Sequence, residues 1–68
     1  MKMTYDEDAD AAYIYVKEKI EKGEVKKTIS LNENIILDFD KNEKLIGIEI
    51  LNAKTVMPKT SISKKLAS

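Results

Sequence analysis

Hydrophobic and polar residues alternate along several short segments of the chain, and this period of two is typical of half-buried β-strands. The clearest example is the segment 45–51, where an isoleucine occupies every second position from 46 to 50. Its other side carries Gly47 and Glu49 between leucines, and this mixed character suggests that another element covers it in part. The segments with strand character are 1–5, 11–16, 25–31, 35–39 and 45–51.

The segment 11–16 fits two interpretations. A helix would be consistent with apolar residues at i, i+4 and i+8, namely Ala12, Val16 and Ile20. Asp10 would then be its N-cap, and Gly23 would follow its C-terminus. The run Tyr-Ile-Tyr-Val is bulky and β-branched, which favours a strand. The residues favour the strand, and the helix stays open as an alternative.

Polar turn residues separate the strands, as in the acidic stretch 6–8 and the segments 32–34 and 40–44. Because consecutive strands tend to be neighbours, we expect a mainly β (α+β) fold, a small antiparallel meander of about five short strands.

The sheet is expected to end before Pro58, which pushes its predecessor towards an extended conformation. Residues 59–67 could form a short helix that packs across one face of the sheet or onto a partner. The chain is therefore expected to comprise one β-rich domain at 1–54 and a C-terminal segment at 55–68, which is a short helix or partly disordered.

Twelve basic residues, all of them lysine, balance twelve acidic ones, and the chain has no histidine, cysteine or arginine. The lack of histidine excludes a Ser-His-Asp triad and an imidazole metal site within this chain. The lack of cysteine excludes a thiol nucleophile, a disulfide and a thiolate metal site. The neutral net charge argues against nucleic-acid binding. No apolar run suits a membrane span or a signal peptide, so a cytoplasmic protein without membrane contact or cofactor is expected.

Three aspartates near the N-terminus have the spacing of the first calcium-loop ligands. They are Asp6, Asp8 and Asp10. That loop also requires a glycine and a bidentate glutamate, where this chain has Ala11 and Lys17. We therefore expect a turn capped by carboxylates rather than a metal site.

Two acidic residues interrupt apolar strands, and we expect both to face solvent. If their strands form a hairpin, Asp38 and Glu49 lie opposite or diagonal to each other and repel, unless a lysine such as Lys27 intervenes. A general acid/base pair is the alternative interpretation. Gly47 within its strand suggests the close approach of a ring, either Tyr13 or Phe39.

Three tyrosines could stack on nucleic-acid bases, but the acidic residues around them would repel phosphates. We therefore place them in the core or at an interface. They are Tyr5, Tyr13 and Tyr15.

Two stretches of the chain together resemble a small prokaryotic family, the domain of unknown function 2283. The first is Tyr-Asp-Glu-Asp-Ala-Asp-Ala-Ala-Tyr-Ile at 5–14. The second is Asp-Phe-Asp at 38–40 followed by Leu-Ile-Gly-Ile-Glu-Ile-Leu-Asn-Ala at 45–53. The resemblance covers residues 1–54, implies a small β-rich cytoplasmic protein and supports the strand at 11–16. It also implies, for some members, partnership with small toxin-like proteins encoded nearby.

The leading functional interpretation is a non-enzymatic protein-interaction module, since a small sheet with open edges invites pairing. It would form a homo-oligomer such as a dimer or bind a small partner protein. One alternative is a metal-dependent or acid/base enzyme built on the acidic residues. The other is a nucleic-acid-binding regulator. The candidate functional residues are Tyr5, Asp6, Asp10, Tyr13, Asp38, Gly47 and Glu49.

Overall fold

The structure is a computed structural model that describes residues 1–62 of the 68-residue chain. Within that part, five strands precede a short helix and a helical turn over residues 59–62. The elements are β1 (Lys2–Asp6), β2 (Ala11–Tyr15), β3 (Lys27–Ser30), β4 (Ile35–Phe39), β5 (Leu45–Leu51) and α1 (Ala53–Val56). The expected mainly β class with five antiparallel strands is confirmed. The rest of the helix expected at 59–67 lies outside the described residues.

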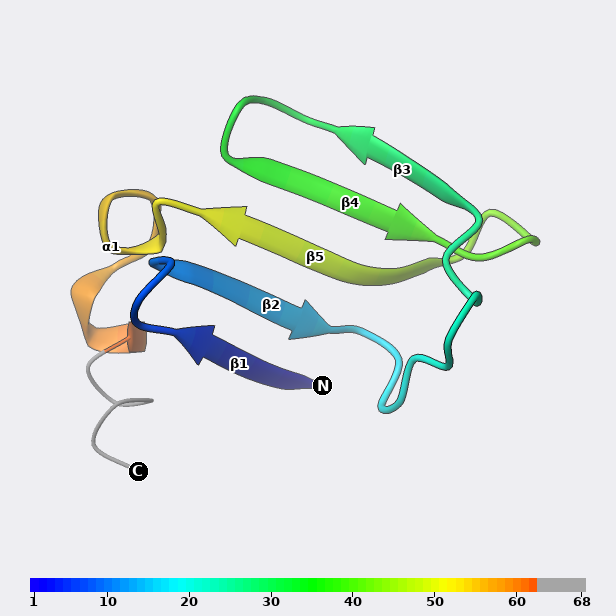
Figure 1. Ribbon diagram of the computed structural model, residues 1–68, viewed down its shortest axis with the longest axis horizontal. Coiled ribbons are helices and arrows are strands. Elements are labelled where there is room, and N and C mark those ends of the chain that lie inside the picture. The colour runs from blue at the N-terminus through cyan, green and yellow to red at the C-terminus, as the bar shows by residue number, and fades with distance from the viewer. Residues whose placement is uncertain (63–68) are drawn as a thin grey trace.

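All five strands belong to one sheet in the order β1-β2-β5-β4-β3 (Figure 1), and every neighbouring pair is antiparallel. An N-terminal hairpin, β1–β2, lies beside a three-stranded meander, β3–β4–β5. The order departs from one continuous meander at the connection from β2 to β3, because β5 and not β3 pairs with β2. The last strand of the sheet is therefore its central strand.

The segment 11–15 is a strand, and the helical alternative is wrong. Its backbone pairs with β1 on one side and β5 on the other. A helix there would leave both of those strands without their partner. The third strand is shorter than expected, at 27–30 instead of 25–31.

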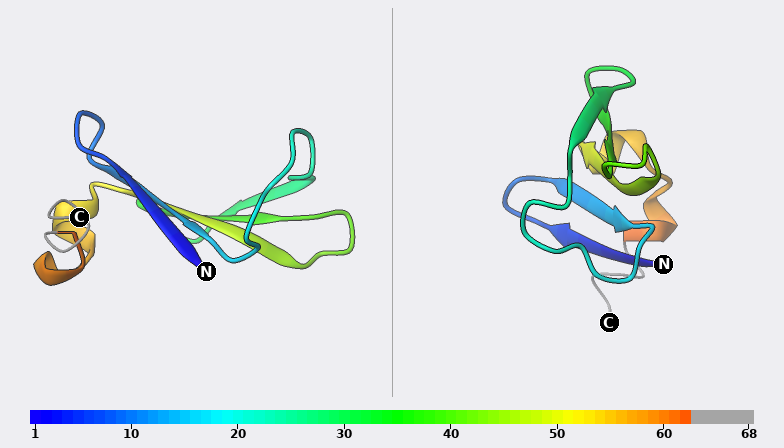
Figure 2. Two further views of the ribbon diagram at one scale, coloured as in Figure 1. Left: turned by 90° about the horizontal axis from the view of Figure 1, so that it is seen from below. Right: turned by 90° about the vertical axis from the view of Figure 1, so that its right-hand side faces the viewer.

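One face of the sheet is apolar from edge to edge. One row of apolar residues crosses all five strands in the order of the sheet. From β1 to β3 the row consists of Met3, Ile14, Ile48, Leu37 and Ile29. The sheet is strongly twisted, and the C-terminal helical segment lies on one side of it, while the connection from β2 to β3 lies on the other (Figure 2).

The described part of the C-terminal segment, up to Ile62, packs on one end of the apolar face. Ala53 and Ile62 join Ala12 and Ile50 in the buried cluster, as expected for a segment that packs across the sheet. Left-handed Asn52, with φ 54°, turns the chain from β5 into α1. No side chain of a large residue is completely buried among the described residues, so the core is thin.

Replacing Ile50, which is 7% exposed, by alanine is expected to lower the free energy of unfolding. The expected loss is about 2–4 kcal/mol, since it combines lost transfer free energy with a cavity. Urea denaturation followed by circular dichroism measures it. Leu45→Ala is the control, because Leu45 is 36% exposed. Equal losses for the two variants would contradict the position of the core.

Candidate functional site: two tyrosine–aspartate pairs

A tyrosine on the polar face links the two halves of the sheet. The Tyr13 hydroxyl, from β2, donates a hydrogen bond of 2.7 Å to Oδ2 of Asp38, in β4. The Thr28 hydroxyl, from β3, donates to the other oxygen, Oδ1, at 2.9 Å. Both carboxylate oxygens of Asp38 therefore have a donor, and the cluster spans four adjacent strands.

Gly47 makes this crossing possible. Tyr13 and Asp38 lie diagonally across β5, and Asp38 stands opposite Gly47 in the register. A Cβ atom at position 47 would overlap the hydroxyl and the ring of Tyr13. The expected close approach of a ring to Gly47 is confirmed, and the ring is that of Tyr13 rather than Phe39.

Asp38 and Glu49 lie on one face and diagonal to each other, because Asp38 pairs with Gly47 and Glu49 with Ile36. Both positions are half-buried on the polar face of the sheet. The expected relief by Lys27 is wrong. Its ammonium lies 3.4 Å from a carboxylate oxygen of Glu43. Neutral hydroxyl groups satisfy Asp38 instead.

A second tyrosine–aspartate pair anchors the first helix. The Tyr5 hydroxyl donates to Oδ1 of Asp10 at 2.8 Å, and the Lys54 backbone N–H donates to the same oxygen at 3.0 Å. The Asp10 carbonyl accepts the N–H of Ala53 at 3.0 Å. Asp10, with φ 50°, therefore joins the β1–β2 turn to the start of α1.

Of the two aspartates before Asp10, only Asp6 is seen to cap the expected turn with its carboxylate. Oδ1 of Asp6 accepts the backbone N–H groups of Asp8 and Ala9 at 3.1 and 3.3 Å. Asp8 contributes its N–H to this turn. Over residues 1–62, no three or more carboxylates converge in a way that could hold a metal ion.

The third tyrosine lies beside the first pair. The Tyr13 and Tyr15 rings meet edge to face, with centroids 4.9 Å apart. The Lys2 ammonium lies 4.6 Å from the centroid of Tyr15. Ile20, from the connection to β3, completes an open hollow of about 250 Å³ with the two rings.

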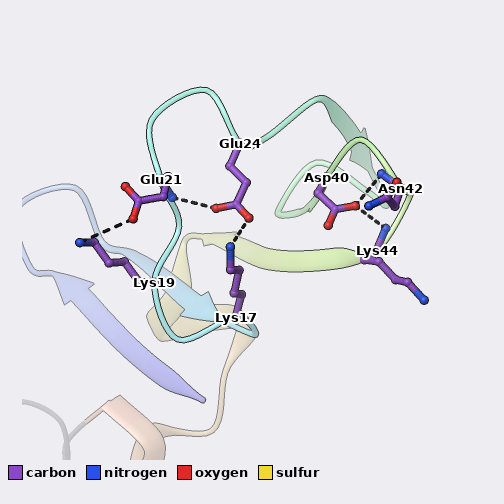
Figure 3. Close-up of polar contacts among 7 residues, drawn as sticks. All are labelled: Lys17, Lys19, Glu21, Glu24, Asp40, Asn42 and Lys44. Carbon is purple, nitrogen blue, oxygen red and sulfur yellow. Dashed lines mark hydrogen bonds and ion pairs between the residues drawn. The ribbon is translucent and has the colours of Figure 1, made fainter.

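Charged contacts shape that connection and the turn beside it (Figure 3). The Lys17 ammonium pairs with Glu24, and this hydrogen bond lowers the pKa of the Glu24 carboxyl. In the β4–β5 turn, Asp40 accepts the backbone N–H groups of Lys44 and Asn42 at 3.0 and 2.8 Å. These bonds lower the pKa of Asp40.

The two tyrosines of the pairs are hydrogen-bond donors and not bases. Desolvation and the hydrogen bond to Asp10 raise the pKa of Tyr5 to about 12. Desolvation and the hydrogen bond to Asp38 raise the pKa of Tyr13 in the same direction. Both phenols therefore stay protonated at neutral pH. The geometry suits structural links better than proton transfer.

The structure brings the candidate residues into two clusters, one around Asp38 and one around Asp10. Whether either cluster acts in function stays a prediction. Sequence reasoning missed Thr28 as the second donor to Asp38. The predicted turn at 32–34 already indicated this contact, because a hairpin that turns there places Thr28 opposite Asp38.

The fold and these clusters define a small antiparallel β-protein held together by tyrosine–aspartate links. The sequence profile of the proteins of unknown function DUF2283 matches residues 2–54, and the chain belongs to that family. The resemblance seen in the sequence is thus confirmed.

An uncharacterized protein of Methanocaldococcus jannaschii is 42% identical to the chain over 53 residues, which are 78% of this chain. The aligned part is 41% of that protein, so the chain spans about two-fifths of its relative's length. No solved structure is significantly similar to the chain.

Gly47→Ala is expected to cost about 1–3 kcal/mol of stability, because the new methyl group displaces the hydrogen-bonded Tyr13 ring. The same substitution in a Tyr13→Ala background should cost nothing, since the space is then free. Urea denaturation of the four proteins in this cycle measures the coupling. In a Tyr15→Ala background the cost should persist. An equal cost with and without Tyr13 would refute the close approach.

Alkaline conditions are expected to weaken the fold through the raised pKa values of Tyr5 and Tyr13. An unfolded tyrosine ionises near pH 10, so the stabilising contribution is complete below about pH 10 and is lost as pH rises through the folded pKa. The double variant Tyr5→Phe/Tyr13→Phe should therefore lose less stability on alkalinisation than the native chain.

Denaturation midpoints measured from neutral to strongly alkaline pH test this expectation. Tyr15→Phe is the matched control and should keep the native dependence. Lysine deprotonation affects all three proteins alike. Identical pH profiles for the double variant and the native chain would show that the tyrosine hydroxyls are not coupled to folding.

Proposed function

We propose that the protein is a non-enzymatic interaction module that associates with a second copy of itself. The observation that carries the proposal is the incomplete cover of the apolar face. Helical residues cover it near Ala12 and Ile50, whereas Ile29 at the far edge is 41% exposed. Leu31, just beyond the same strand, is 65% exposed.

The thin core supports association for energetic reasons. A domain of about 60 residues buries only about 60% of the surface of its unfolded chain, and domains of this size often gain stability from disulfides, metals or oligomerisation. The chain has no cysteine. The described residues offer no cluster of metal-binding side chains. Burial against another copy would supply apolar contacts that the single chain makes only in part.

The polar clusters support a non-enzymatic role. Each carboxylate oxygen of Asp38 accepts one hydroxyl, and Asp10 accepts a hydroxyl and a backbone N–H. Like any phenol with a pKa of about 10 or above, both tyrosines keep their protons at neutral pH and act there as hydrogen-bond donors. These groups hold elements of the fold together, and each is already engaged in doing so.

No helix in the described part of the chain is long and apolar enough to cross a membrane. The proposal includes a cytoplasmic location, which the cysteine-free composition supports.

Self-association is measured by size-exclusion chromatography with light scattering. The expected mass at high micromolar concentration is twice the 7.7 kDa of one chain. The melting temperature should also rise with protein concentration, because association stabilises the folded state by mass action. A single-chain mass together with a concentration-independent melting temperature would contradict the proposal.

A further inference from the structure

Exposed apolar side chains gather at the β3 edge of the sheet, where Ile29 is 41% and Leu31 is 65% exposed. β3 is an outer strand, and all four of its residues are exposed. Ile29 is within it, and Leu31 follows it directly. Natural edge strands are usually protected by charges, prolines or bulges. β3 has only Lys27, at its beginning.

Within residues 1–62, the register of β3 directs some of its backbone hydrogen-bonding groups away from β4. The Leu31 N–H donates to the Ile35 carbonyl at 2.8 Å, and Ile29 stands opposite Leu37 in the same register. Hydrogen-bonded pairs alternate along an antiparallel ladder, so Ile29 also directs its N–H and C=O towards β4. The backbone N–H and C=O groups of Thr28 and Ser30 therefore point away from β4, towards the outer edge of the sheet.

We propose that β3 pairs with β3 of a second copy, antiparallel and about a two-fold axis at Ile29. This inference rests on the proposed self-association and names its interface. Thr28 of each copy then faces Ser30 of the other, and the outward N–H and C=O groups bond to each other. The sheet continues from one copy into the other.

The side chains also match in this register. Ile29 faces its own counterpart in a non-hydrogen-bonded pair, where Cα atoms are about 4.5 Å apart and side chains are close. Leu31 faces Lys27 of the partner copy, whose aliphatic stem can cover it while the ammonium stays in water. The apolar row across the sheet thereby becomes continuous between the two copies.

Charge favours the antiparallel direction. Lys26 and Lys27 lie at the start of β3, and Glu33 lies beyond its end. Antiparallel pairing brings the basic end of one strand beside the acidic end of the other. A parallel arrangement would place the lysines side by side, and like charges on adjacent strands destabilise.

The opposite edge is a weaker candidate. On β1, the apolar residues Met3 and Tyr5 are half-buried against the cluster that includes α1. The Tyr5 hydroxyl is already bonded to Asp10. Apart from the terminal Met1, which is 89% exposed, pairing through β1 would therefore draw on apolar side chains that already pack within the chain.

A single cysteine tests the interface sharply, because the chain contains none. In the proposed dimer, the two cysteines of the Ile29→Cys variant face each other as a non-hydrogen-bonded pair, with Cα atoms about 4.5 Å apart. A disulfide requires a Cα separation of about 4.4–6.8 Å, so the two thiols can form one. Oxidation of the folded variant with copper phenanthroline should produce a covalent dimer on non-reducing gels. Thr4→Cys is the matched control, since Thr4 is the exposed central residue of β1. It should remain largely uncrosslinked.

The outcomes separate this interface from self-association itself. A native chain that is dimeric by light scattering, with cross-linking at position 29 and not at position 4, supports the proposal. A dimeric native chain that cross-links at position 4 only, or at neither position, overturns the β3 interface and leaves self-association standing. A monomeric native chain overturns both.

A proline variant provides a second readout. Ser30→Pro removes an N–H that points outwards, so the ladder to β4 stays intact, and proline is tolerated on edge strands in this orientation. It should shift the chain to the monomer mass with an unchanged strand signal in circular dichroism. Ser30→Ala keeps the N–H and should remain dimeric. A Ser30→Pro variant that folds and stays dimeric would overturn the interface.

Discussion

The hydrogen bond between the Tyr13 hydroxyl and the Asp38 carboxylate joins the two halves of this protein. The N-terminal hairpin and the C-terminal meander meet along β2 and β5. The one-sided apolar pattern already disfavours a one-residue slip of these strands, and a polar link between specific side chains restricts their register further. Gly47 leaves the space for this link, so a position without a side chain governs how the halves dock.

The same reliance on polar links appears at the helical end. Asp10 accepts the Tyr5 hydroxyl and the Lys54 backbone N–H, and its carbonyl accepts the N–H of Ala53. The chain can thereby dock α1 although the helix is only 4 residues long, far below the length at which an isolated helix is stable. Hydrogen bonds position the elements, and the thin apolar cluster supplies the burial that stabilises them. Among residues 1–62, the far edge at Ile29 receives no such cover, and our proposal of association starts from this observation.

The sequence predicted the positions of individual strands better than the contacts between side chains of different strands. Alternation together with residue type located all five strands, and the tyrosine-rich bulk of residues 11–16 correctly favoured a strand there. The close approach of a ring to Gly47 also followed from a glycine within a strand. Lys27 was wrongly expected to relieve Asp38, because Lys27 lies opposite Phe39 and alternation along β3 directs Thr28, not Lys27, to the face of Asp38. Thr28 was overlooked although the β3–β4 turn already implied its position.

The amino-acid sequence by itself determined the class of the fold, the chemistry it lacks and the family. Period-two patterning is local, and missing histidine, cysteine and arginine need no structure to be interpreted. Only the tertiary structure decided that β5 is central, that Tyr13 reaches Asp38 across it, and that Ile29 lies at an open edge. These are contacts between segments distant in the chain. Local patterns carry no information on them, because antiparallel strands of similar composition can pair in several orders.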